Sequence, residues 1–138
     1  MKHLTSIIVL LCLCISPLLS QNETLPAQRN LSERLQATAQ ALQLDEAQAA
    51  KLQTVYLRES AQLQEITSLK TSDPQKYTQK LQAIRKGTMG SIRLLLRDEQ
   101  IPLYNQLAAQ WRLQEHQLRQ KMKGSPEMDI QEALMRQF

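Results

Sequence analysis

The spacing of apolar residues between Leu52 and Leu69 constrains the fold of this chain more than any other feature of its sequence. Apolar side chains recur there at intervals of three and four positions, and only Glu59 interrupts the pattern. This spacing places the side chains along one face of an α-helix, whereas a half-buried strand requires strict alternation. From Gln21 onward the chain is rich in residues that favour helices, and it lacks the β-branched runs that form strands. The sequence therefore predicts an all-α fold.

The N-terminal segment is predicted to direct export. A short basic start is followed by an apolar run with a late proline, which is typical of a secretory signal peptide over residues 1–20, cleaved after Ser20. A membrane anchor is the less favoured alternative, because the uninterrupted apolar core is too short to span a bilayer comfortably. Cys12 and Cys14 both lie in this segment, so no disulfide is expected in the remaining chain. We expect a periplasmic or otherwise secreted protein that begins with a flexible leader, residues 21–30.

Proline, glycine and capping residues divide the rest of the chain into about four helices and a tail. Asp73 can cap a helix and Pro74 fits the first position of that helix, so one boundary lies there. We expect antiparallel long-helix hairpins at residues 31–71 and 74–123, which together form a helical domain, residues 31–123. Each helix is apolar on one face only, so the hairpins need a partner surface. Either a small bundle or an open cradle that dimerises would provide it.

The C-terminal tail, residues 124–138, begins with the sequence Gly-Ser-Pro, which stops the preceding helix. Beyond this stop, Ile130, Leu134 and Phe138 recur at helical spacing and predict a short amphipathic helix. This helix is expected either to dock on the domain or to extend from it.

Two copies of a Leu-x-x-x-Gln motif occur at predicted helix starts, in the sequences LDEAQ (44–48) and LRDEQ (96–100). In the first copy, Asp45 can accept a hydrogen bond from the backbone N–H of Gln48, and the Gln48 side chain can return one, which forms a capping box. In the second copy, the Arg97 side chain has no acceptor atom and cannot cap a helix. Asp98 can cap one residue later, but Pro102 then follows within the first turns of the helix. We expect either a turn between two helices or a kink in one continuous helix. The motif and helix-cap residues are Leu44, Asp45, Gln48, Leu96 and Gln100.

With these motifs in an exported helical chain, residues 31–123 resemble the Spy/CpxP-like family, whose members carry a repeated Leu-Thr-x-x-Gln (LTXXQ) motif. Asp45 and Arg97 stand in place of the family's threonine. The resemblance implies antiparallel hairpins that form a homodimeric cradle. It also implies an ATP-independent periplasmic chaperone or an envelope stress-response factor, with unfolded or partner proteins as ligands. The alternative is a structural adaptor that binds one specific envelope partner.

The helix predicted after Pro74 carries a face of positive charge, since no acidic residue occurs between Lys76 and Arg97. A helical wheel places its cations opposite the apolar stripe. They form either a solvated face or a surface that attracts acidic partners, such as unfolded clients or, less favoured, an anionic membrane. Nucleic acid is disfavoured by export and by the lack of interleaved aromatic residues. The candidate partner-binding residues are Lys76, Lys80, Lys86, Arg93 and Arg97.

Residues that could support catalysis are few beyond the predicted signal peptide. His116 is the only histidine there, and the acid pairs lie at predicted helix starts, where the helix dipole favours acids. Zinc would need several converging ligands, and only Glu115, Met122 and Met128 are available to join His116. The sequence therefore predicts a protein that is not an enzyme and has neither a cofactor nor a metal site.

Overall fold

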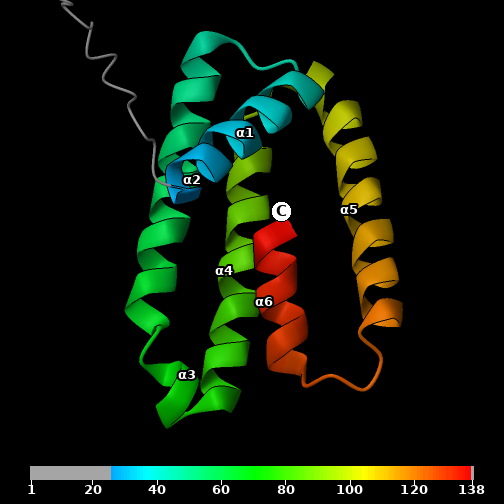
Figure 1. Ribbon diagram of the computed structural model, residues 1–138. Coiled ribbons are helices and arrows are strands. Elements are labelled where there is room, and N and C mark those ends of the chain that lie inside the picture. The colour runs from blue at the N-terminus through cyan, green and yellow to red at the C-terminus, as the bar shows by residue number, and fades with distance from the viewer. Residues whose placement is uncertain (1–25, 138) are drawn as a thin grey trace, which may run out of the picture.

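The computed structural model describes residues 26–137, and all regular secondary structure in this range is helical. The all-α prediction is therefore confirmed (Figure 1). The long helices are α1 (Pro26–Ala41), α2 (Glu46–Ile66), α4 (Pro74–Leu94) and α5 (Ile101–Lys121). The shorter elements are α3 (Leu69–Ser72), the 3₁₀ turn η1 (Asp98–Gln100) and the C-terminal helix α6 (Glu127–Gln137). The predicted signal peptide, residues 1–20, lies outside the described residues, as does Phe138.

The starts of α2 and α4 follow directly from their capping residues. Asp45 Oδ1 accepts from the Gln48 N–H at 2.8 Å, and Gln48 Oε1 accepts from the Asp45 N–H at 3.2 Å, so the predicted capping box is confirmed. At α4, Asp73 accepts from the Lys76 N–H at 3.0 Å, and Pro74 lies in the first turn. Side chains that are close in sequence therefore fix where both helices begin.

Two predicted boundaries differ from the structure. α1 begins at Pro26, so residues 26–30 of the expected flexible leader are helical. Proline suits a first turn because the N–H that it lacks would have no helical partner there. α2 ends at Ile66, earlier than expected. Its last turn tightens as the Thr67 N–H bonds to the Gln64 carbonyl at 3.2 Å, three residues back.

α1 and α2, within the expected hairpin of residues 31–71, contact each other, whereas the expected hairpin of residues 74–123 does not form, because α5 does not pack along α4. α2 and α4 instead run antiparallel and make the most extensive contact between helices, while α5 diverges from α4 (Figure 1). α1 contacts both α2 and α5 at the end of the molecule where α5 begins. α6 packs against both α4 and α5, so the amphipathic C-terminal helix docks on the domain. Docking of α6 takes up the face of α4 that a simple α4–α5 hairpin would have used.

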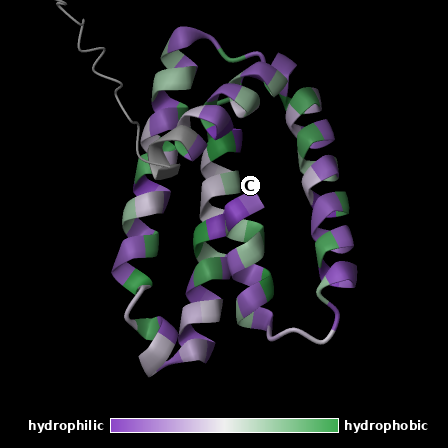
Figure 2. Ribbon diagram, viewed as in Figure 1, coloured by the Kyte–Doolittle hydropathy of each residue, from purple (hydrophilic) through white to green (hydrophobic). Residues whose placement is uncertain are grey.

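Two hydrophobic clusters hold the helices together, one toward each end of the α2–α4 pair. Figure 2 shows that hydrophobic and hydrophilic residues are interspersed along the helices, as expected for helices that bury one face. The α5-end cluster is formed where α1 and the start of α5 cover that pair. Its buried members are Leu42, Leu52, Val55, Tyr56, Ile92, Tyr104 and Ala108. The α6-end cluster lies near α3 and α6, and its buried members are Ile66, Tyr77, Leu81 and Ile84. Within residues 26–137, no helix is both long and apolar enough to cross a membrane.

Candidate functional site

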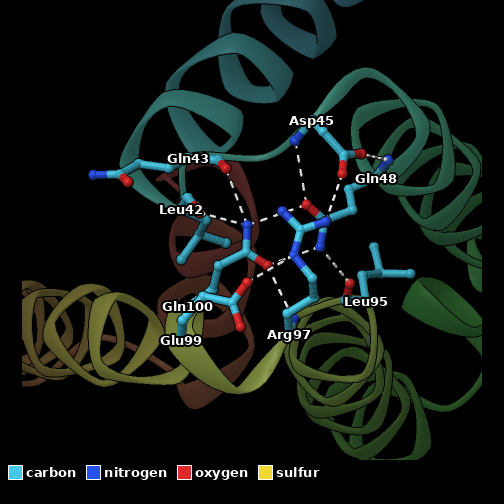
Figure 3. A network of polar contacts seen from close by, with 8 residues as sticks. All are labelled: Leu42, Gln43, Asp45, Gln48, Leu95, Arg97, Glu99 and Gln100. Carbon is cyan, nitrogen blue, oxygen red and sulfur yellow. Dashed lines mark hydrogen bonds and ion pairs between the residues drawn. The ribbon is translucent and has the colours of Figure 1, made fainter.

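The two Leu-x-x-x-Gln motifs are far apart in the sequence, but Gln48 and Gln100 bond to each other in the structure (Figure 3). The first motif opens α2, and the second spans the break between α4 and α5. Leu44 and Leu96 both pack against the α5-end cluster, which anchors the two loops. Gln48 and Gln100 are only 6% and 4% exposed, so their amide groups need partners within the protein.

Gln48 uses its whole side-chain amide in this network (Figure 3). Its Oε1 accepts from the Asp45 N–H and from Gln100 Nε2, the latter at 3.1 Å. Its Nε2 donates to Gln100 Oε1 and to the Leu95 carbonyl, both at 2.8 Å. The Leu95 carbonyl lies at the end of α4, where the helix leaves it without an intrahelical donor. Gln48 therefore caps both the start of its own helix and the end of α4.

Gln100 makes the matching bonds in the second motif. Its Oε1 accepts from the Arg97 N–H at 2.9 Å and from Gln48. Its Nε2 donates to the carbonyls of Leu42 at 3.2 Å and Gln43 at 3.0 Å. These carbonyls lie at the end of α1, where Gln43 adopts a left-handed backbone conformation with φ of 51°. Each glutamine thus joins the start of its own helix to the end of the helix that precedes the other motif, and the pair is termed the glutamine clasp.

The second motif forms a turn between two helices, so the alternative of a kinked continuous helix is wrong. α4 ends at Leu94, η1 follows, and α5 begins at Ile101. Arg97 supplies backbone groups to the turn, since its carbonyl accepts from the Gln100 N–H at 2.9 Å. Because η1 intervenes, Pro102 falls in the first turn of α5, where proline is tolerated. α5 therefore does not start at Arg97 or Asp98, and Pro102 does not interrupt a helix.

Asp45 and Arg97 occupy the same position in the two motifs, carry opposite charge and contact each other. Arg97 Nη1 lies 2.6 Å from Asp45 Oδ2, and Arg97 Nε lies 3.0 Å from Glu99 Oε1. The hydrogen bond from Arg97, together with one from the Gln48 N–H, lowers the pKa of Asp45, and Asp45 raises the pKa of Arg97. Both side chains are about half exposed, which limits the stabilisation that the pair provides. Arg97 therefore joins the two motifs and does not extend the predicted basic face of α4.

The other predicted cations, Lys76, Lys80, Lys86 and Arg93, are exposed on α4 as the helical wheel predicts. None of the four forms an ion pair with another residue in the range that the structure describes. These four residues, termed the basic face, thus present uncompensated positive charge to solvent.

A groove of about 380 Å³ lies between α2 and α4, and Lys80 of the basic face lines it. Its lining includes Arg58, Glu65, Ile66, Lys80, Ile84 and Gly87. The two isoleucines contribute apolar surface, and positive charge outnumbers negative among these residues. Nothing lies within 4 Å of the position that a Cβ on Gly87 would take, so the groove is open on the α4 side. Such a groove can accept a polypeptide segment that carries apolar and acidic side chains.

The structure also contains a buried ion pair that sequence reasoning missed. Glu59, which interrupts the apolar stripe of α2, has a side chain 3% exposed and bonds to Arg34 of α1 at 2.6 and 3.1 Å. The Arg34 guanidinium lies over the Tyr56 ring, 4.1 Å from its centroid, and the Tyr56 hydroxyl bonds to Thr38 Oγ1 at 2.8 Å. Burial raises the pKa of Tyr56. The available signal was an acid within an apolar stripe, because a buried carboxylate requires a partner.

The residues considered for metal binding do not come together as a set of metal ligands in the described part of the chain. His116 is exposed on α5, and Met128 packs against the α6-end cluster as an ordinary apolar side chain. Among residues 26–137, no group of three or more His, Cys, Asp or Glu residues is arranged to hold a metal ion.

Comparisons with protein-family models, curated proteins and solved structures give no match to this chain. The fold and the clasp define the class as an all-α protein in which two Leu-x-x-x-Gln motifs interlock. Membership of the Spy/CpxP-like family rests on the sequence motifs and stays a prediction.

Proposed function

We propose that this protein is an exported helical binding protein that acts as an ATP-independent chaperone or an envelope-stress factor. The motif resemblance to the Spy/CpxP-like family and the predicted signal peptide support this proposal. The glutamine clasp is consistent with it, because the amides of Gln48 and Gln100 are fully used within the protein. The motifs thus serve architecture, and partner proteins bind elsewhere.

The observation that carries the proposal is the basic face of α4 beside the groove between α2 and α4. The four cations of this face lack anionic partners among the described residues, so their field extends into solvent. Positive charge accelerates the encounter with acidic segments, and the groove then contacts apolar side chains that an unfolded client exposes. Contacts of this kind need no single client sequence, which suits a chaperone.

An aggregation assay tests the proposal. At equimolar ratio and without nucleotide, the protein should reduce the light scattering of a chemically denatured client. The variant K80E/K86E/R93E should weaken this suppression, because it reverses three charges of the basic face, of which Lys80 lines the groove. Added salt should weaken it as well, since the Debye length falls to about 10 Å at 0.1 M ionic strength.

The variant K51E/R112E/K121E is the matched control. It makes the same change in net charge at three exposed positions on α2 and α5, so it should suppress aggregation as the wild type does. Equal loss in both variants would show that only net charge matters, and no suppression by the wild type would refute the chaperone role.

The adaptor alternative predicts a different outcome in a pull-down from envelope extract. One partner captured at stoichiometric amount would favour an adaptor, whereas many partners at low amounts would favour a chaperone. Sedimentation of the purified protein separately tests the homodimer that the family resemblance implies.

A further inference from the structure

The C-terminal helix α6 covers the α6-end cluster as a separate amphipathic element. Leu134 and Ile130 are 0% and 7% exposed, and Met128 and Met135 pack against the same cluster. The turn that leads into α6 contains Gly124, whose φ of 94° favours glycine. α6 is therefore joined to the domain by a single turn and held by one apolar face.

The ion pairs that join α6 to its neighbours place the acids on α6 and the cations on α3 and α5, and Arg119 also pairs with Glu115 of its own helix at 3.1 Å. Glu132 bonds to Lys70 of α3 at 2.6 Å and accepts from the Tyr77 hydroxyl at 3.1 Å. Glu127 bonds to Arg119 of α5 at 3.0 and 3.1 Å. Lys70 and Arg119 chiefly lower the pKa values of Glu132 and Glu127, respectively. The surface beneath α6, termed the α6 seat, thus consists of the α6-end cluster with Lys70 and Arg119 at its rim.

The packing of α6 is also imperfect. Among residues 26–137, the buried side-chain polar atoms without a hydrogen-bond partner are Gln131 Oε1 on α6 and Arg85 Nε on α4. Gln131 is 1% exposed, and its Nε2 bonds to Glu127 at 2.7 Å. Arg85 lines a small cavity of about 20 Å³ together with Met135 of α6. An unpaired buried polar atom destabilises the interface that contains it. The packing of α6 on the domain is therefore less stable than it would be with an apolar side chain in place of Gln131.

We propose that the α6 seat is a docking groove for an acidic amphipathic helix of another protein, and that α6 is its resident, displaceable occupant. A competing helix needs an apolar stripe flanked by acids at the positions of Glu127 and Glu132. Charge complementarity with Lys70 and Arg119 selects such a helix over a basic one. A competitor with an apolar residue in place of Gln131 avoids the unpaired oxygen, so it binds the seat more tightly than a free helix of the α6 sequence does. This inference does not depend on the proposed chaperone activity.

Hydrogen exchange on the full-length wild-type protein tests whether α6 opens on its own. We expect the amides of α6 to exchange at least about tenfold faster than those of α4, because local opening requires less free energy than global unfolding. Gln131→Met removes the unpaired acceptor, so it should slow exchange in α6 and leave α4 unchanged. Equal protection of α6 and α4 in the wild type would overturn the proposal.

A fluorescent peptide with the sequence of residues 126–137 then tests the seat itself by anisotropy. It should bind full-length E127K/E132K at least about tenfold more tightly than wild type, because the resident helix of that variant is repelled by the rim cations. The matched control E46K/D98K makes the same change in net charge at two exposed positions, at the start of α2 and in η1, that lie outside both the seat and the groove, and it should behave as wild type. A peptide with the two lysine substitutions should bind neither protein.

The outcomes separate the proposal from its competitors. Failure of the peptide to bind E127K/E132K, with that variant helical by circular dichroism, would overturn it. Concentration-dependent dimerisation of that variant without peptide binding would place a second copy on the seat, so an external partner would be wrong. If E127K/E132K does not fold, the proposal is tested instead by comparing peptide binding to wild type and to Gln131→Met. The peptide should bind Gln131→Met more weakly, and equal binding would contradict the proposal.

Discussion

Substituting Gln100 with alanine would remove one half of the glutamine clasp. Five hydrogen bonds join this side chain to Leu42, Gln43, Gln48 and Arg97. Gln43 and Arg97 are exposed residues, so water can replace the bonds to their backbone groups. The carbonyl of Leu42 and one N–H of the Gln48 amide belong to buried residues, and both would be left without a partner. The cost of the substitution is therefore concentrated in two buried groups.

The magnitude follows from the number of unsatisfied groups. A buried polar group without a partner costs about 1–3 kcal/mol, so the two groups that Gln100→Ala leaves unpaired should lower the free energy of unfolding by about 2–6 kcal/mol. A domain of this size has a total stability of about 5–15 kcal/mol, so the variant should still fold. Its Tm should fall by about 10 °C or more.

Urea unfolding followed by circular dichroism measures this loss by linear extrapolation. The control Gln106→Ala changes an exposed glutamine on α5 and should stay within about 0.5 kcal/mol of wild type. Combining Gln100→Ala with Gln48→Ala completes a double-mutant cycle, which should show a coupling free energy of about 0.5–3 kcal/mol. A cost no greater than that of the control, or strict additivity of the two changes, would refute the clasp as a stabilising unit.

Other parts of the fold make independent predictions. Arg34→Ala leaves the Glu59 carboxylate buried and unpaired, so it should cost about 3–5 kcal/mol in urea unfolding, while Arg34→Leu/Glu59→Leu should recover most of that loss. Arg97 holds the pKa of Asp45 below its usual 3.8, so the stability from this pair is present above that pH and is lost below it. The difference in Tm between wild type and Asp45→Asn should therefore shrink as the pH falls below 3.8, and a constant difference would contradict the assignment. Nothing lies within 4 Å of a Cβ added at Gly90 in α4, so Gly90→Ala should raise the unfolding free energy by about 0.5–1 kcal/mol, whereas a loss would show hidden packing there.

Several structural features could be predicted from the sequence because they depend on neighbours in the chain. The caps at Asp45 and Asp73 each bond to an N–H three residues later, and helix geometry alone brings those groups together. The apolar stripes and the exposed cations of α4 follow from the same geometry, since 3.6 residues per turn place them on fixed faces. The all-α class and the basic face could therefore be predicted without knowledge of any tertiary contact.

The tertiary structure decided which of these faces and caps meet. Gln48 and Gln100 are 52 residues apart, and Glu59 lies 25 residues from Arg34, so no local spacing pairs them. Arg97 could not cap its own helix, yet its role became clear once the fold brought it to Asp45. The docking of α6 likewise replaced the expected pairing of α4 with α5. A sequence determines local structure because bonded geometry fixes short distances, whereas distant partners are chosen by the joint burial of many apolar faces and the polar groups between them.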